Sequence, residues 1–161
     1  MRAVLQRVSH ARVIAQNEAG LFDTTGEIGS GLFVLLGVLK GDTERETQRL
    51  VEDILHYRVF EDEDGRMNRS LLEERLGLLV VSQFTLAADG RRGRRPSFDQ
   101  AADPVLAEPL YERFIELARG AGVTVGTGRF GAPMRCEITG DGPATFLLER
   151  KPQTPVDSAR G

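Results

Sequence analysis

The stretch Leu78-Leu79-Val80-Val81-Ser82-Gln83-Phe84-Thr85-Leu86 joins an apolar run to a hydroxyl, an amide, an aromatic ring and a second hydroxyl. The apolar part predicts a strand that is covered on both faces, and ligands of mixed α/β proteins usually bind at the ends of such strands. Ser82, Gln83 and Thr85 are therefore candidate site residues. The simpler interpretation is that they satisfy backbone groups in a local turn.

The chain has 161 residues, which fits one domain that can bury a sizeable core. Its single cysteine, Cys136, excludes an internal disulfide and lies in a predicted strand, so we expect it to pack rather than to react. The longest apolar run, Leu32 to Leu39, is too short to cross a membrane, and the first residues do not resemble a signal peptide. We therefore expect a soluble, cytoplasmic protein with no membrane partner.

The formal net charge is -3, so a polyanionic partner would have to be met by a local basic patch. One such patch exists in a loop that contains glycine and proline: Arg91, Arg92, Arg94 and Arg95. The forked guanidinium group suits phosphate oxygens, which favours a nucleic-acid contact. The alternative is a solvated loop whose charges pair with nearby acids.

Helices and strands alternate along the chain in a way that predicts an α/β domain with a mixed, barrel-like curled sheet and two main helices. The first helix follows Asp42-Thr43-Glu44, an oxygen-bearing cap with acids after it. The second covers residues 104–121, with Leu106, Leu110, Phe114 and Leu117 predicted on its apolar side. Strands are expected at residues 1–15, 32–38, 78–81, 123–127, 134–139 and 144–148, and a turn at 20–25.

Two polar segments are expected to lie outside this core. Glu61-Asp62-Glu63-Asp64-Gly65 lacks the spaced ligands of a calcium loop, so a solvated hairpin turn is expected. Residues 151–161 are polar and hold two prolines, which predicts disorder. The domain is accordingly placed at residues 1–149 and the tail at 150–161.

A second candidate site interrupts the last two predicted strands at Gly142-Pro143. Glycine lets the backbone approach a ligand closely, whereas proline removes an N–H and fixes φ, so a carbonyl can be displayed here. The alternative is an ordinary turn between strands.

Familiar catalytic machinery is missing from the sequence. There is no Gly-x-Ser-x-Gly motif, and the two histidines, His10 and His56, are expected to be packed or solvated. No cluster of cysteine and histidine suggests a metal site, and no phosphate-binding loop is present. An enzyme with this sequence would use few ionisable side chains, and we expect neither a metal nor a cofactor.

These segments together resemble the D-aminoacyl-tRNA deacylase family over residues 1–149. The matching stretches follow the order of the family: residues 1–8, 26–29, 82–86, 94–98, 108–111, 128–131 and 142–145. Three features depart from the family pattern. Gly140 stands where asparagine is usual, Pro133 stands where an acid is common, and the loop at residues 17–25 is longer.

The resemblance implies an enzyme that hydrolyses the ester between a D-amino acid and the 3′-terminal adenosine of tRNA. It also implies a homodimer in which a cis Gly142-Pro143 peptide of one subunit enters the pocket of the other. Its carbonyls would hold the α-ammonium group, while an L side chain would collide with the dipeptide. Glycine has no side chain to exclude, so glycine mischarged on alanine tRNA is an expected second substrate.

We expect backbone N–H groups near Phe84 and Thr85 to stabilise the developing oxyanion, with a neighbouring ribose hydroxyl assisting proton movement. Ser82 and Gln83 would orient the terminal adenosine or its ester. Thr85 as a covalent nucleophile is an alternative, although no base lies nearby in sequence. Arg7 and the arginine loop are the predicted tRNA contacts. Two other classes compete, a non-catalytic RNA-binding module and a small-molecule esterase or amidase.

Overall fold

The apolar run forms an interior strand of a six-stranded mixed sheet in a computed structural model that describes residues 1–152. It forms β6 (Gly77–Ser82), which pairs in parallel with β3 (Gly31–Gly37) and with β7 (Val125–Thr127). Alternate side chains of β6 belong to two apolar clusters, one packed against the helices and the other inside the curve of the sheet. The prediction of a strand covered on both faces is confirmed.

One long strand, β1 (Arg2–Gln16), connects the two halves of the sheet. Its first half pairs with β3, its second half pairs with β2 (Phe22–Ile28), and β8 (Met134–Glu149) runs along its other edge. The sheet then curls until β2 lies against β7, where a Cβ atom on Gly26 would come within 2.6 Å of backbone atoms of Thr127. The nearly closed, mixed sheet matches the predicted architecture.

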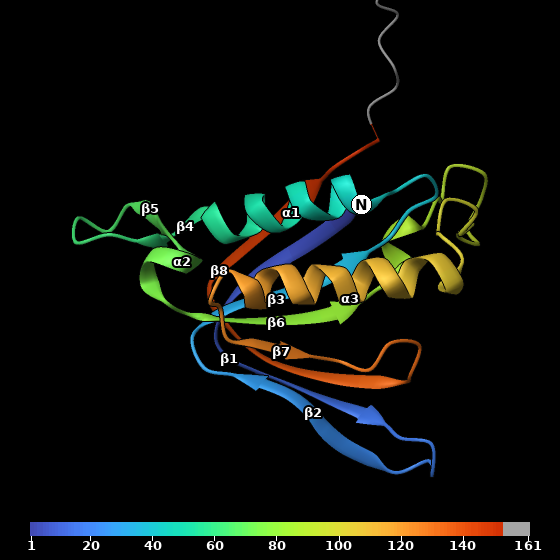
Figure 1. Cartoon of the computed structure of the whole chain (residues 1–161), viewed down its shortest axis with the longest axis horizontal. Coiled ribbons are helices and arrows are strands. Elements are labelled where there is room, and N and C mark those ends of the chain that lie inside the picture. Colours follow the sequence, from blue (N-terminus) through green and yellow to red (C-terminus); the bar gives the residue numbers. More distant parts are fainter. Residues whose placement is uncertain (153–161) are drawn as a thin grey trace, which may run out of the picture.

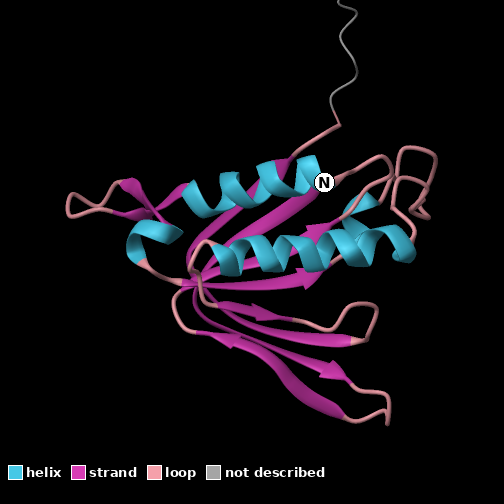
Figure 2. Cartoon of the chain, in the orientation of Figure 1, coloured by secondary structure: helices cyan, strands magenta, loops and turns pink. Residues whose placement is uncertain are grey.

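Two long helices, α1 (Glu44–His56) and α3 (Pro104–Gly120), cover one side of the sheet (Figures 1 and 2). Shorter elements are α2 (Leu71–Glu74) and the 3₁₀ helix η1 (Phe84–Ala87). Thr43 and Glu46 form a capping box at the start of α1. None of the helices in the described part of the chain has the length and apolar character needed to span a membrane.

The face that α3 turns to the core differs from the predicted one. The buried side chains are Ala107, Tyr111, Phe114, Ile115 and Ala118. Only Phe114 was on the predicted stripe, and Leu106 is 65% exposed. The helix is rotated by about one residue position relative to the prediction, and Leu110 and Leu117 of the predicted stripe are partly buried against the core. Leu106 is left at the surface beside the candidate site.

Three boundaries also differ from the predictions. Residues 22–25 are part of β2 rather than a turn, because they pair with the end of β1. Residues 134–149 form one interrupted strand instead of two. Arg150, assigned to the tail, donates its N–H to the Met1 carbonyl at 2.9 Å and pairs with Asp53. The predicted disorder of residues 153–161 lies outside the described residues.

Candidate active site

A cavity of about 790 Å³ opens where β3 and β6 end. In Figure 1 the arrowheads of both strands point toward the loops that surround it. Ser82, Gln83 and Phe84 line this cavity, whereas Thr85 lies one residue beyond its wall. The structure therefore brings three of the four predicted residues to the cavity, at the carboxyl end of a buried parallel strand.

Backbone contacts hold the Ser82-Gln83-Phe84 turn in place. The Gln83 N–H donates to the Leu36 carbonyl at 2.8 Å, and the Gln83 side-chain amide donates to the Thr85 hydroxyl. Gly37 lets the end of β3 approach closely, because a Cβ atom there would lie 3.0 Å from the Gln83 carbonyl oxygen. Thr85 thus supports Gln83 in this structure.

The first turn of η1 leaves backbone donors next to the cavity. Among the described residues, no backbone carbonyl or capping side chain accepts a hydrogen bond from the N–H of Phe84 or Thr85. Unpaired N–H groups are a general property of helix starts. Their position beside Ser82 and Gln83 makes them available to an oxygen atom bound in the cavity.

The cavity also contains side chains outside the predicted set. They include Lys40, Phe98, Asp99, Asp103, Tyr111 and Phe130. The Tyr111 hydroxyl donates to the Val80 carbonyl at 2.9 Å, and burial raises the pKa of this phenol, so it remains protonated. Phe98, Tyr111 and Phe130 had a prior signal, since each belongs to a stretch that resembles the family.

Cys136 is exposed on β8 and lines the cavity, which contradicts the expectation that it only packs. The cause is the position of β8 at the edge of the sheet, where one face of the strand meets the cavity. Partial burial raises the pKa of the Cys136 thiol, so the nucleophilic thiolate is disfavoured. Neither His10 nor His56 lines the cavity, so neither can act as a base there in this subunit.

Gly142-Pro143 lies far from the cavity of its own chain. The peptide bond is cis, as the resemblance implies. Gly140 pairs with Val8 and Thr145 pairs with Gln6, so the residues between them bulge out of β8. This bulge is level with residues 31–33 of β3, about 10–17 Å along the strands from the end that meets Ser82. β1 and β3 also separate it from β6.

Arg7 holds the base of this bulge. Its guanidinium contacts the Asp141 carboxylate at 3.0 Å and donates to the Val59 carbonyl at 2.9 Å, with Glu61 at 3.5 Å. The side chain is only 7% exposed. Little of the side chain is open to a ligand, and the contact of Arg7 with tRNA stays a prediction. Its charge is used within the protein, where it positions Gly142.

The arginine loop extends from a short backbone bridge between Asp89 and Ser97. Arg91 pairs with Asp89, and hydrogen bonds from Arg91 lower the pKa of the Asp89 carboxyl to about 2. The other three arginines, Arg92, Arg94 and Arg95, are exposed and make no ion pair with any described residue. The loop therefore presents three free cations.

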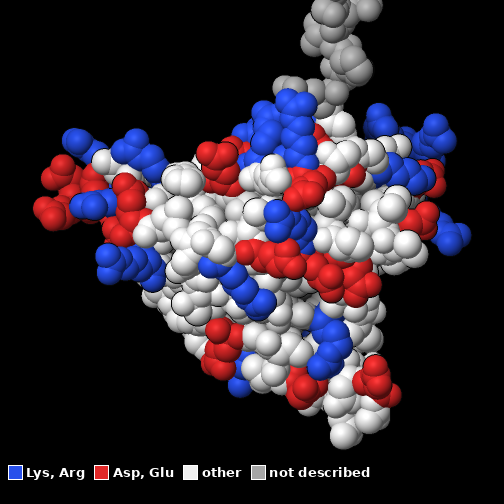
Figure 3. Space-filling model, in the orientation of Figure 1, with Lys and Arg blue, Asp and Glu red and all other residues white. Residues whose placement is uncertain are grey.

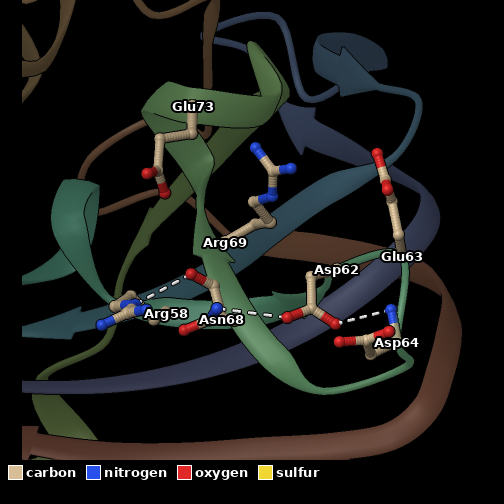
Figure 4. Close-up of a pocket in the computed structure, with 7 residues that line it drawn as sticks. All are labelled: Arg58, Asp62, Glu63, Asp64, Asn68, Arg69 and Glu73. Atoms are coloured by element: carbon tan, nitrogen blue, oxygen red, sulfur yellow. Dashed lines mark hydrogen bonds between the residues drawn. The ribbon is translucent and has the colours of Figure 1, made fainter.

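The acidic turn forms a solvated hairpin between β4 (Arg58–Glu61) and β5 (Met67–Ser70), as predicted. Beside it lies a surface hollow of about 370 Å³ (Figure 4). Asp62 accepts hydrogen bonds from the N–H groups of Asp64 and Arg66, and the Arg66 bond is the main reason that its pKa is lowered. No group of acidic, histidine or cysteine side chains in the described chain could hold a metal ion.

The chain matches a known protein family over most of its length. The family model described as "D-Tyr-tRNA(Tyr) deacylase" matches residues 4–149. The chain belongs to this deacylase family. Two curated relatives named D-aminoacyl-tRNA deacylase are each 52% identical to it. One is from Dehalococcoides mccartyi, with 94% of this chain and 95% of the relative covered, and the other is from Symbiobacterium thermophilum, with 92% and 95% covered.

Two solved structures share the fold of this deacylase. One, "c-Myc DNA Unwinding Element Binding Protein", has a TM-score of 0.84 and 38% identity, with 94% of this chain and 100% of that chain covered. The other is described as "Structural Analysis of a probable eukaryotic D-amino acid tRNA deacylase", with a TM-score of 0.77, 22% identity and coverage of 91% and 97%. The second match supports the fold alone.

Proposed function

We propose that this deacylase hydrolyses the ester bond of D-aminoacyl-tRNA and of glycine mischarged on alanine tRNA, and releases the free amino acid and tRNA. Family membership makes the chain a hydrolase. The observation that carries the proposal is the cavity wall at the end of β6, where Ser82, Gln83 and Phe84 adjoin two unpaired backbone donors. A tRNA substrate places this activity in the cytoplasm.

The chemistry needs a positioned water and a stabilised oxyanion, because an aminoacyl ester is already activated. Water adds its oxygen to the ester carbonyl carbon, and the N–H groups of Phe84 and Thr85 stabilise the negative oxygen that results. The bond to the ribose oxygen then breaks, and that oxygen takes a proton with help from the neighbouring ribose hydroxyl. Ser82 and Gln83 orient the terminal adenosine.

A second subunit would complete the site. Gly142-Pro143 does not line the cavity of its own chain, and β8 pairs only with β1 among the described strands. The strand also carries exposed apolar side chains, including Leu147 and Ile138, and an unpaired strand edge is commonly covered by another chain. We propose a homodimer in which the Gly142 loop of each subunit enters the cavity of the other.

The enzyme would then distinguish D from L substrates by excluding the L side chain. Gly142 has a φ of +127°, which only glycine adopts without strain, and Arg7 fixes the adjacent Asp141. A fixed loop of this kind can display carbonyl oxygens to an α-ammonium group while it leaves no room for an L side chain. Glycine would be admitted because it has no side chain.

The direct test is to incubate the protein with D-tyrosyl-tRNA, L-tyrosyl-tRNA, glycyl-tRNA and a free D-amino-acid ester. Rapid loss of the D-tyrosyl and glycyl substrates alone supports the proposal. Hydrolysis of the free ester at a similar rate would favour a small-molecule esterase. Binding of every tRNA without hydrolysis would favour a nucleic-acid-binding protein, the class to which the name of the 38% identical structure points.

Thr85→Ala separates the main-chain mechanism from a covalent one. The hydroxyl accepts a hydrogen bond from Gln83, and no histidine lines the nearby cavity to activate it. We therefore expect the alanine variant to keep at least about a tenth of the wild-type rate, because the backbone donors remain. Loss of deacylation with unchanged tRNA binding would instead assign the hydroxyl a direct role.

A further inference from the structure

One rim of the cavity combines exposed aromatic rings with free cations. Leu39 bridges to Ala101, and the Lys40 N–H donates to the Gln100 carbonyl at 2.9 Å. The bridge between Asp89 and Ser97 then joins this segment to the arginine loop. Backbone hydrogen bonds therefore fix Lys40, which lines the cavity, on the same rim as the arginines.

The aromatic part of the rim is open to solvent. Phe84 is 60% exposed and Phe98 is 36% exposed, and the two rings form an edge-to-face pair with centroids 5.2 Å apart. Val105 and Leu106, in the first turn of α3, are 83% and 65% exposed. Rings that stand beside guanidinium groups form the usual surface for stacked bases of single-stranded nucleic acid.

We propose that the single-stranded 3′ end of the RNA leaves the cavity along this rim. The bases that precede the terminal adenosine stack on Phe84 and Phe98 and cover the apolar first turn of α3. Their phosphates contact Lys40 first and then three cations of the arginine loop: Arg92, Arg94 and Arg95. This inference rests on the proposed tRNA substrate and adds the path by which it enters.

The opposite rim is less suited to this path. There Arg129 is engaged by Asp23 and by the Gln16 carbonyl, and Arg135 lies over the ring of Phe22. In Figure 1 the arginine loop lies above the start of α3 and the β7–β8 loop lies below it. Figure 3 shows basic side chains gathered over the upper of these two corners.

Two acids limit the path further. Asp99 and Asp103 also line the cavity, and both are exposed. A phosphate between them would be repelled, so the backbone of the RNA has to pass on the side of Lys40 and the arginine loop. Removing one of these charges should therefore strengthen binding, which is the opposite of the effect expected from the cations.

The test measures binding of uncharged tRNA, and of the same tRNA without its 3′-terminal CCA, over a series of salt concentrations. Phe98→Ala should weaken binding of the intact tRNA about tenfold and leave the truncated tRNA unaffected. Replacing Arg92, Arg94 and Arg95 together by glutamine should make the dependence of the binding constant on salt less steep. The slope of its logarithm against the logarithm of salt concentration should fall in magnitude by about 2, as expected for three contacts to a single strand. Asp99→Asn should tighten binding about twofold.

Matched controls lie on the β4–β5 hairpin, where Met67 and Arg66 are similarly exposed. Met67→Ala and Arg66→Gln should leave all binding constants unchanged. An equal effect of Phe98→Ala on intact and truncated tRNA would overturn the inference, and so would a change in the dimer dissociation constant, which would make the rim a contact between subunits.

The wild-type rate on D-tyrosyl-tRNA is measured separately, so the two proposals can fail independently. A protein that binds the 3′ end as described but leaves D-tyrosyl-tRNA intact would refute the proposed activity alone. A protein that hydrolyses D-tyrosyl-tRNA while Phe98 and the three arginines are all dispensable for binding would refute the path alone.

Discussion

The two ends of the β3–β6 strand pair are held in different ways. At the starting end, side-chain contacts hold the structure. Arg7 bridges Asp141, Glu61 and the Val59 carbonyl beside the Gly142 loop. At the carboxyl end, backbone contacts hold the Ser82-Gln83-Phe84 turn, and the N–H groups beside it are left unpaired. One end is a fixed surface, whereas the other is a wall with unused donors.

This difference indicates that the two ends suit different functions. A loop whose charges are already satisfied can exclude a wrong ligand without rearranging, because it has no partner to gain. A wall with unpaired donors can stabilise charge that develops during a reaction. Mutations that act on one end alone should therefore separate substrate selection from rate.

The largest effect is expected at the starting end of the strand pair. A Cβ atom on Gly31 would lie 1.9 Å from the Gly77 carbonyl oxygen, so Gly31→Ala must force β3 and β6 apart. We expect a loss of about 4 kcal/mol or more in the free energy of unfolding, measured with denaturant. Gly29→Ala is the control, because a Cβ atom there meets nothing within 4 Å. Similar stabilities for the two variants would contradict the close approach of β3 and β6 at Gly31.

Arg7→Met removes the clamp on the Gly142 loop while it keeps an unbranched side chain. We expect a loss of about 2 kcal/mol, because the buried Val59 carbonyl loses its donor. Preference for D-tyrosyl-tRNA over L-tyrosyl-tRNA should fall about tenfold, with a smaller change in the rate on the D substrate. Arg12→Met is the control, since Arg12 pairs with Glu137 in solvent. Unchanged selectivity in the Arg7 variant would show that the clamp is only structural.

Gly37→Ala addresses the carboxyl end. The added Cβ atom would lie 3.0 Å from both the Gln83 carbonyl oxygen and the Leu86 Cβ atom, so the Ser82-Gln83-Phe84 turn has to shift slightly. We expect a stability loss of only about 1 kcal/mol. Deacylation should slow about 10- to 100-fold with selectivity retained, because donors at the wall are displaced. Gly90→Ala, with open space around the new Cβ atom, should behave as wild type.

The smallest effect concerns the reactivity of Cys136 in the cavity wall. Burial raises the pKa of this thiol, and the thiolate is the reactive form, so alkylation by iodoacetamide at pH 8 should be slower than for free cysteine. The alkylation rate of Cys136 should continue to rise with pH at values where the alkylation rate of N-acetylcysteine, the free reference thiol, no longer changes. Mass spectrometry over a pH series measures both rates, and coincident profiles would rule out the raised pKa.

The sequence was sufficient to predict the parts of the site that are local. A buried strand followed by polar residues identified the Ser82-Gln83-Phe84 wall, and the capping pattern located α1. Lys40 and Asp103 could not be selected, because they reach the cavity through pairing between distant segments such as Leu39 and Ala101. No local pattern encodes such a contact.

The buried face of α3 shows another limit of sequence reasoning. The predicted stripe through Leu106 and the observed one through Ala107 and Tyr111 both fit a helical repeat. In the folded protein the buried face is the one with smaller residues and a tyrosine, whose hydroxyl donates to the Val80 carbonyl of β6. Likewise, the burial of Arg7 depends on the β4 strand, which the sequence does not place beside it.

The long strand β1 has a consequence for how the protein folds during synthesis. Arg2 pairs with Glu149, so the first strand finds one of its neighbours only after nearly the whole chain has been made. At ribosomal speeds this delay is on the order of ten seconds, during which an edge of β1 stays unpaired. Pairings so distant in sequence also fold slowly. The nascent chain is therefore expected to need protection from self-association until β8 emerges.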